Sequence, residues 1–341
     1  MSQLQLGLII AGAFVLLGVV LQNFWLARRN RPRQGTPSVF GPHDELANLE
    51  PTLNEPGGDG FALPVSEKKP TLDALIDVIA PIALETPVTG EALLAAMPPT
   101  RRVGSKPFTI EGQTQGQQRW EFPVAGRSYT QLQAGIQLAN RSGALNDIEF
   151  SEFVMKTQTF CDIVGGTPDF PEMRQEISRA RELDQFAGDH DAQLSFVLRA
   201  RRAAWSASYI QQTAAKLGFV PGSIDGRMVV PASQAGLPPV LSLSFDAQAA
   251  LAEDPTQSAL REVSLVLDVA QVDRNERAFE RMREAALTLA QEMDGLVTDD
   301  NGVALPNEAL DVIGSELAHL YDTLAQRELA AGSALARRLF S

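Results

Sequence analysis

The first hydrophobic feature of the chain is a long uncharged stretch near its amino terminus. No charged residue occurs from Leu4 to Leu26, and every residue from Leu6 to Leu21 is apolar. An α-helix needs about 20 such residues to cross the hydrocarbon of a bilayer. The pattern predicts a transmembrane helix over residues 6–26, preceded by a short external segment, residues 1–5. The residues expected to anchor the chain are Leu6, Leu16, Leu21 and Trp25.

The flanks of this stretch indicate its orientation and its fate. Four basic residues follow it, at Arg28, Arg29, Arg31 and Arg33, and only the amino terminus precedes it. Basic residues stay on the cytoplasmic side of a membrane, so we expect the body of the chain in the cytoplasm. A cleaved signal would have small residues at its cut site, where bulky Phe24-Trp25-Leu26 stands here. A buried core helix would show a polar face.

Hydrophobic patterning is absent from the next segment and returns at Thr71. Residues 34–70 are rich in Pro, Gly and acidic side chains and show no periodicity. Such a composition is typical of a disordered linker. We therefore expect residues 27–70 to form a basic flank and a disordered linker.

From Thr71 onward the pattern predicts two related modules, residues 71–191 and 192–330, followed by a tail, residues 331–341. Each module opens with an apolar strand, a polar turn, a short helix and a further strand. Aligning the copies matches Phe153 and Met155 with Ser264 and Val266. This alignment predicts that both pairs lie on strands, and it pairs Phe170 with Phe279.

The second module shows its elements most clearly. Alternating apolar residues predict strands over 194–200, 240–246 and 263–269, each with one buried face. Asp273 is a plausible N-cap for a surface helix that Gly295 ends. A short strand and a final helix to about Leu329 follow. The expected fold class is α+β, with the amino-terminal transmembrane helix followed by one or two antiparallel sheet modules that carry helices on one face.

Charge narrows the classes of partner. The net charge is −13, and without the four arginines after the apolar stretch 25 basic residues face 42 acidic ones. An acidic body is a poor nucleic-acid binder, so no nucleic-acid partner is expected. The arginines can instead contact anionic lipid headgroups. The single cysteine, Cys161, cannot form an internal disulfide, which suits a reducing compartment.

Candidate chemistry is sparse. The histidines, His43, His190 and His319, are scattered without metal-ligand spacing, and no residue near Cys161 in sequence would activate its thiol. We therefore expect no catalytic, cofactor-binding or metal-binding residues, no small-molecule substrate and no enzyme activity. The run Arg199, Arg201 and Arg202 has two interpretations, a basic recognition patch or a solvated strand edge.

These features together resemble a known family. The apolar stretch near residue 1, its four arginines, the acidic linker and the element order of the last 150 or so residues are similar to ZipA. The segment Ala290–Asp300, with its helix end, glycine, apolar pair and acidic turn, is the strongest local match. ZipA anchors the tubulin-like FtsZ ring to the bacterial inner membrane. The resemblance implies a cell division protein at the division site, with a periplasmic amino terminus and two partners, membrane lipids and the carboxy-terminal tail of FtsZ.

In that family an apolar groove on the open sheet face takes the FtsZ tail. Here the candidate groove residues are Ile224 and Val266 in the second module and Phe153 and Met155 in the first. The linker is shorter than is usual in the family, and Ser242, Ser244 and Asp246 make the open face polar. The alternative function is therefore a membrane-anchored binding module for another cytoplasmic or envelope-assembly client. A membrane-anchored enzyme is a third reading, and it would need a convergent site.

Overall fold

The computed structural model describes residues 72–114, 116, 119–251 and 258–341. Their contacts divide the chain into two compact units. The first module comprises residues 72–191 together with 334–341, and the second module comprises the described residues of 192–333. The expected transmembrane helix and linker, residues 6–70, lie outside the described residues. Within the described ranges, no helix is both long and apolar enough to cross a membrane.

The first module is built on an antiparallel sheet with the strand order β2-β3-β5-β1-β8, and β4 pairs with the free side of β3. Apolar residues alternate along its long central strands, and one face of the sheet packs on helices. The strands are β1 (Asp77–Thr89), β2 (Arg102–Val103), β3 (Lys106–Thr114), β4 (Trp120–Glu121), β5 (Ser128–Gln137) and β8 (Gly166–Pro168), with a separate hairpin of β6 (Ala139–Asn140) and β7 (Gly143–Ala144).

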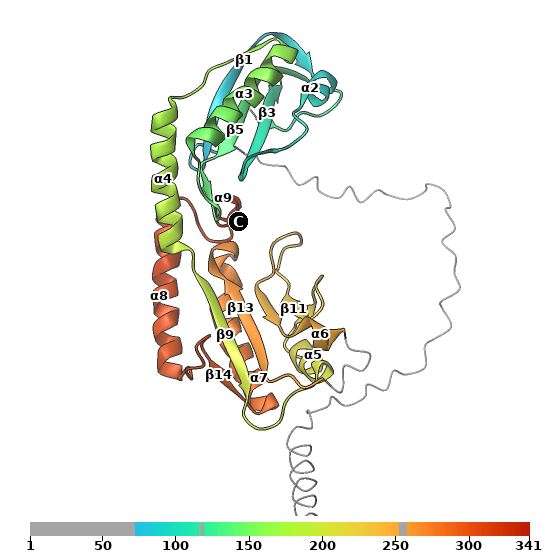
Figure 1. Cartoon of the computed structure of the whole chain (residues 1–341), viewed down its shortest axis with the longest axis vertical. Coiled ribbons are helices and arrows are strands. Elements are labelled where there is room, and N and C mark those ends of the chain that lie inside the picture. The colour runs from blue at the N-terminus through green and yellow to red at the C-terminus, as the bar shows by residue number, and fades with distance from the viewer. Residues whose placement is uncertain (1–71, 115, 117–118, 252–257) are drawn as a thin grey trace, which may run out of the picture. The chain divides into compact units, whose positions relative to one another are not determined.

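Helix α3 (Asp147–Val164) covers this sheet, as Figure 1 shows. Asn146 and Glu149 form a capping box that starts the helix, and Gly165 ends it in the left-handed conformation. Phe150, Phe153 and Phe160 are buried at helical spacing against the strands. The other helices of the module are α2 (Gly90–Ala96), α4 (Met173–His190) and α9 (Ala334–Leu339).

Helix α9 comes from the other end of the chain. Leu339 and Phe340 are buried, and Arg338 makes a two-pronged ion pair with Asp77, whose carboxylate is fully buried. The side chain of Gln137 also donates to the Arg338 carbonyl. Residues 334–341, expected from the sequence as part of a tail, are therefore folded into the first module.

The second module carries an antiparallel sheet with the order β10-β11-β12-β13-β9-β14. Figure 1 shows β9 and β13 side by side. The strands are β9 (Gln193–Ala200), β10 (Val220–Pro221), β11 (Arg227–Val230), β12 (Leu241–Ser244), β13 (Glu262–Asp268) and β14 (Gly295–Thr298). The helices are α5 (Ala207–Ala215), α6 (Ala247–Ala250), α7 (Ala278–Met293) and α8 (Asn307–Gln326), with 3₁₀ turns η1 (Val269–Gln271) and η2 (Arg274–Glu276). The expected combination of antiparallel sheets and helices is confirmed.

The two modules share one topology. In each, a long strand leads through a short helix to further strands, a long helix, a short edge strand and a last long helix. One backbone hydrogen bond fixes the register in each copy: Leu138 donates to the Ile76 carbonyl, and Val269 donates to the Ala192 carbonyl. Counted from these two bonds, each residue pair between β9 and β13 has a counterpart between β1 and β5.

The two modules therefore share an order of elements, but the alignment expected from the sequence is wrong after β5. Phe153 and Met155 lie on helix α3, the counterpart of α7, and not on a strand. The Phe170 to Phe279 pairing fails for the same reason, because Phe170 follows β8 whereas Phe279 lies in the first turn of α7. The register makes Gln133 and Gly135 the counterparts of Ser264 and Val266.

Candidate functional site

Val266 lies on the open face of the second sheet. Its neighbours along β13, Leu265 and Leu267, are fully buried toward the helices, while Val266 is only partly buried. It pairs with Ser195 on β9 and Ser242 on β12. As the alternation predicts, Leu241 and Leu243 are buried and Ser242 and Ser244 are not.

Further apolar residues share this open face. Val229 on β11 is paired with Ser242, and Val197 on β9 is paired with Ser264. Leu296 on the edge strand β14 is exposed and paired with Arg199. Single-strand periodicity did not reveal these residues, because only the strand register places them beside Val266. Val197 is only 7% exposed, so Val229, Val266 and Leu296 are the residues of this set with accessible side chains.

Two hollows border this face. The first, of about 380 Å³, adjoins Val229 and Arg227 at the β11 edge. Its remaining wall comes from the loop after β11, with Pro231, Leu237 and Pro239 among the apolar lining residues. The second, of about 490 Å³, lies at the ends of β12 and β13, against Ser244, Ser264 and Phe245 among others.

Ile224 stands beside the first hollow and not on a strand. It lies in the turn between β10 and β11, where Arg227 donates its backbone N–H to the Ile224 carbonyl. Its side chain is 59% exposed. It is therefore available to a partner at the rim, whereas Val266 is central.

Phe153 and Met155 do not form a groove. Phe153 is fully buried, with its ring centroid 6.0 Å from Phe108 and 5.9 Å from both Phe150 and Phe170. Met155 is 67% exposed, two residues further along the same helix. Two residues separated by two positions point to different sides of an α-helix, so one enters the core and the other faces solvent.

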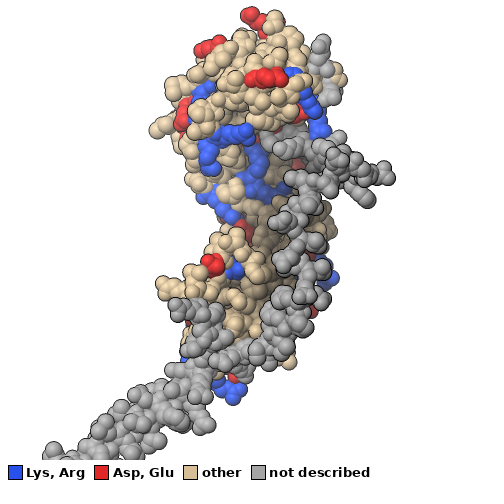
Figure 2. Space-filling view, turned by 90° about the vertical axis from the view of Figure 1, so that its right-hand side faces the viewer, with Lys and Arg blue, Asp and Glu red and all other residues tan. Residues whose placement is uncertain are grey.

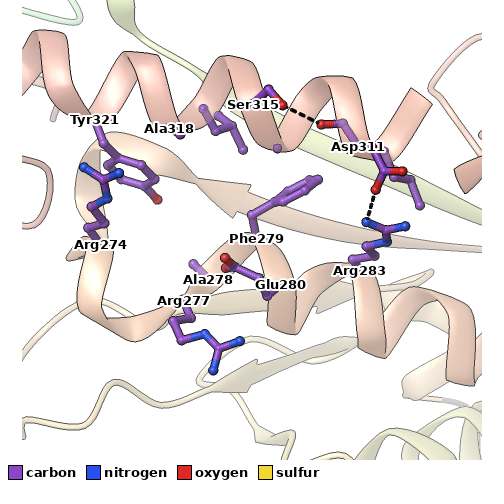
Figure 3. A pocket seen from close by; sticks show the side chains of 13 residues that line it. Arg274, Arg277, Ala278, Phe279, Glu280, Arg283, Asp311, Ser315, Ala318 and Tyr321 are labelled. Atoms are coloured by element: carbon purple, nitrogen blue, oxygen red, sulfur yellow. Dashed lines mark hydrogen bonds and ion pairs between the residues drawn. The ribbon is translucent and has the colours of Figure 1, made fainter. Parts of the chain in front are cut away.

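A third hollow, of about 530 Å³, lies between α7 and α8 (Figure 3). Phe279, Leu310 and Tyr321 form its buried floor, and burial raises the pKa of Tyr321 to about 12. Acidic neighbours pair with two of its rim arginines: Arg283 with Asp311 at 2.5 Å and Arg274 with Asp322 at 2.6 Å. The first pair joins α7 to α8, and the second joins the 3₁₀ turn η2 to α8.

Figure 2 shows Lys and Arg side chains gathered on part of one face. Among the cations of the first module, Lys156 donates to the Arg102 carbonyl and the Thr100 hydroxyl, and it pairs with Glu152. Arg102 in turn donates to the Ser105 carbonyl. These cations fasten the loop before β3 to helix α3.

Titratable groups in the described residues serve the fold. Cys161 is fully buried, and burial raises the pKa of its thiol to about 11. Lys106 is fully buried and donates to Asn140 Oδ1 and to the Gly143 carbonyl, and burial lowers the pKa of its amine. The ring of His190 stacks on Phe186. Across the described ranges, no group of His, Cys, Asp or Glu side chains could hold a metal ion.

Arg199, Arg201 and Arg202 do not form one patch. Arg199 contacts Glu262, and Arg202 pairs with Asp294 at 2.9 Å. The side chain of Arg199 lies on the open face, whereas Arg201 and Arg202 follow the end of β9. Arg199 therefore belongs to an interior strand of the sheet, and neither interpretation describes the three arginines together.

An exposed sheet face that carries apolar residues can accept a segment of another protein. Comparison with protein families specifies the kind. Residues 245–315 match the family described as ZipA, C-terminal FtsZ-binding domain. The match confirms the resemblance to the ZipA family over this stretch, which contains β13, α7 and β14. The matched family is defined by binding another protein and not by catalysis. No curated protein matches the chain.

Proposed function

We propose that this chain is a cell division protein that binds FtsZ through the open sheet face of its second module. The observation that carries the proposal is the position of Val266, at the centre of that face and within the stretch that matches the FtsZ-binding family. The first module contributes neither Phe153 nor Met155 to such a face, so the second module is the stronger candidate.

The composition of the face favours a modest affinity for a single tail. A few apolar anchors carry most of the energy of such interfaces, and here the partly exposed Val229 and Val266 alternate with serines. Many copies gathered along one FtsZ filament would strengthen the attachment without stronger single contacts. Micromolar binding of an isolated tail is therefore expected.

Membrane attachment is the second part of the proposal, and the sequence supports it. The apolar residues 6–26 would form the single span, with Trp25 at the interface and Arg28, Arg29, Arg31 and Arg33 against the lipid headgroups. Residues 34–70 would then tether the modules in the cytoplasm, reaching at most about 3.3–3.6 Å per residue. The protein would work at the inner membrane of the division site.

The test is a titration of residues 71–341 with the labelled carboxy-terminal tail of FtsZ from the same organism. We expect saturable binding, absent for a scrambled tail. Val266→Glu should lower the affinity at least about 10-fold, which corresponds to about 1.4 kcal/mol. Val312→Glu is the matched control, because Val312 is 58% exposed on α8 and lies away from the sheet. Equal affinities of Val266→Glu and Val312→Glu for the tail would show that the open sheet face of the second module is not the FtsZ-binding site.

The serines on the face support the alternative client. Ser195 and Ser242 flank Val266 on both neighbouring strands, so hydrogen bonds would contribute more to recognition than in an apolar groove. A folded sample that binds no FtsZ tail, but retains another cytoplasmic or envelope-assembly protein through the same face, would establish that function. If Val266→Glu no longer retained that protein, its binding site would be located on the open face of the second module.

A further inference from the structure

The open face of the first module lacks a side chain where the second module has Val266. Its counterpart there is Gly135, which pairs with Ile79 on β1 and with Thr109 on β3. Ala134 and Ile136, on either side, are fully buried toward the helices, so Gly135 faces the other way. With no side chain at this position, the sheet has a gap one residue wide.

Leu72 fills the gap. A Cβ atom added to Gly135 would lie 2.8 Å from Leu72 Cδ1 and closer still to Cδ2. Leu72 itself is 8% exposed. The leucine therefore occupies the space that a side chain at position 135 would take, and only glycine permits this approach.

A buried carboxylate holds the backbone of the same residue. The Leu72 N–H donates to Glu111 Oε1 at 3.3 Å, and the Gln133 side-chain amide donates to Glu111 Oε2 at 2.9 Å. Glu111 is fully buried although it stands on the open face. An ionised carboxylate is rarely buried without such partners, because its desolvation is costly.

We propose that this face is a binding site for an extended peptide segment, and that the chain fills the site with its own Leu72. The ligand it takes is a segment whose leucine side chain enters the gap at Gly135 and whose backbone N–H reaches Glu111. Within the chain itself that segment is Leu72–Ile76, and four residues separate Leu72 from β1. So short a connection gives a high effective concentration and keeps other segments out.

The connection is also fixed at its base. The Asp73 N–H donates to Asp77 Oδ2, and the Leu75 N–H donates to Asp73 Oδ1, both at 2.8 Å. The Asp77 carboxylate is the one that Arg338 of α9 holds. The carboxy-terminal helix thus braces the turn that delivers Leu72 to its site.

The test is binding in trans by the full-length protein in detergent micelles. Leu72→Ala should bind a fluorescent peptide of residues 67–76 with micromolar affinity, and the unmodified protein should bind it at least 10-fold more weakly. Two matched controls should abolish binding to Leu72→Ala: a peptide with alanine at position 72, and the added substitution Gly135→Val. Failure of a folded Leu72→Ala protein to bind the peptide would make Leu72 an ordinary core residue and overturn the proposal.

Hydrogen exchange of the unmodified protein gives an answer if Leu72→Ala does not fold. A segment that leaves its site should expose the Leu72 amide at least 100-fold more often than the Ala134 amide on β5. Exchange of both amides at one rate, through unfolding of the whole module, would show that the site never opens. This result would overturn the proposal independently of any variant.

Discussion

The two modules have the same topology, but their open sheet faces differ in whether the chain itself covers them. In the second module, Val266 projects from β13 and remains partly accessible. In the first, Gly135 takes that register position, and Leu72 covers it. One copy is therefore closed by its own chain and the other is left open. The comparison teaches that two modules with one topology can differ at a single register position, so that one face is covered by its own chain and the other is not.

The largest expected effect separates two residues on one helix of the first module. Phe153→Ala removes a fully buried ring from an aromatic cluster, so it should cost about 4 kcal/mol of unfolding free energy. Met155→Ala should change it by less than about 0.5 kcal/mol, because that side chain is exposed. Hydrogen exchange followed by mass spectrometry would localise the loss. Similar costs for the two variants would contradict the assignment of α3.

The second prediction concerns the ion pair that joins the ends of the first module. Arg338→Ala leaves the Asp77 carboxylate buried without its cation, so it should destabilise this module by about 3 kcal/mol. The exchange rates of the second module should stay unchanged. Lys216→Ala is the control, because its pair with Glu292 is exposed and should contribute less than about 1 kcal/mol. A uniform loss across both modules would contradict the division of the chain.

Exchanging the two register positions should have a smaller effect. Gly135→Val would displace Leu72 and cost the first module about 2 kcal/mol by overpacking. Val266→Gly should cost the second module about 1 kcal/mol, because glycine weakens a strand and Val266 is only partly buried. Chemical denaturation of both variants checks this order. A larger loss for Val266→Gly would mean that Val266 belongs to the core.

Local patterns predicted much of the second module. Strict alternation marked β12 and β13, and their buried faces agree with it. Asp273 is an N-cap, as expected, but of the 3₁₀ turn η2 and not of α7. Helix α7 begins later, at Ala278, after Arg277 in a left-handed conformation. The alternation and capping patterns of the sequence did not signal this break.

The first module was harder to predict for two physical reasons. The residues Phe153 and Met155 stand two apart, a spacing that suits one face of a strand, whereas the capping box at Asn146 starts a helix there. The return of α9 to this module depends on a bond between Asp77 and Arg338, far apart in the chain. Long-range pairing of this kind leaves no local signal, and the Leu72 contact with Gly135 is equally invisible to periodicity.

The smallest expected effect is the alkylation of Cys161, whose buried thiol should react only when the first module unfolds. Only a thiolate reacts with alkylating reagents, and burial both raises the pKa of this thiol to about 11 and excludes the reagent. At pH 8 the native protein should show no measurable labelling while a free thiol is labelled completely. Labelling should appear in Arg338→Ala, which loosens the first module. It should remain absent in Met282→Ala, which creates a cavity in the second module, where Met282 is fully buried. Labelling of Cys161 in Met282→Ala would show instead that the two modules unfold together. The open and the closed sheet face would then belong to one cooperative folding unit and not to two independent ones.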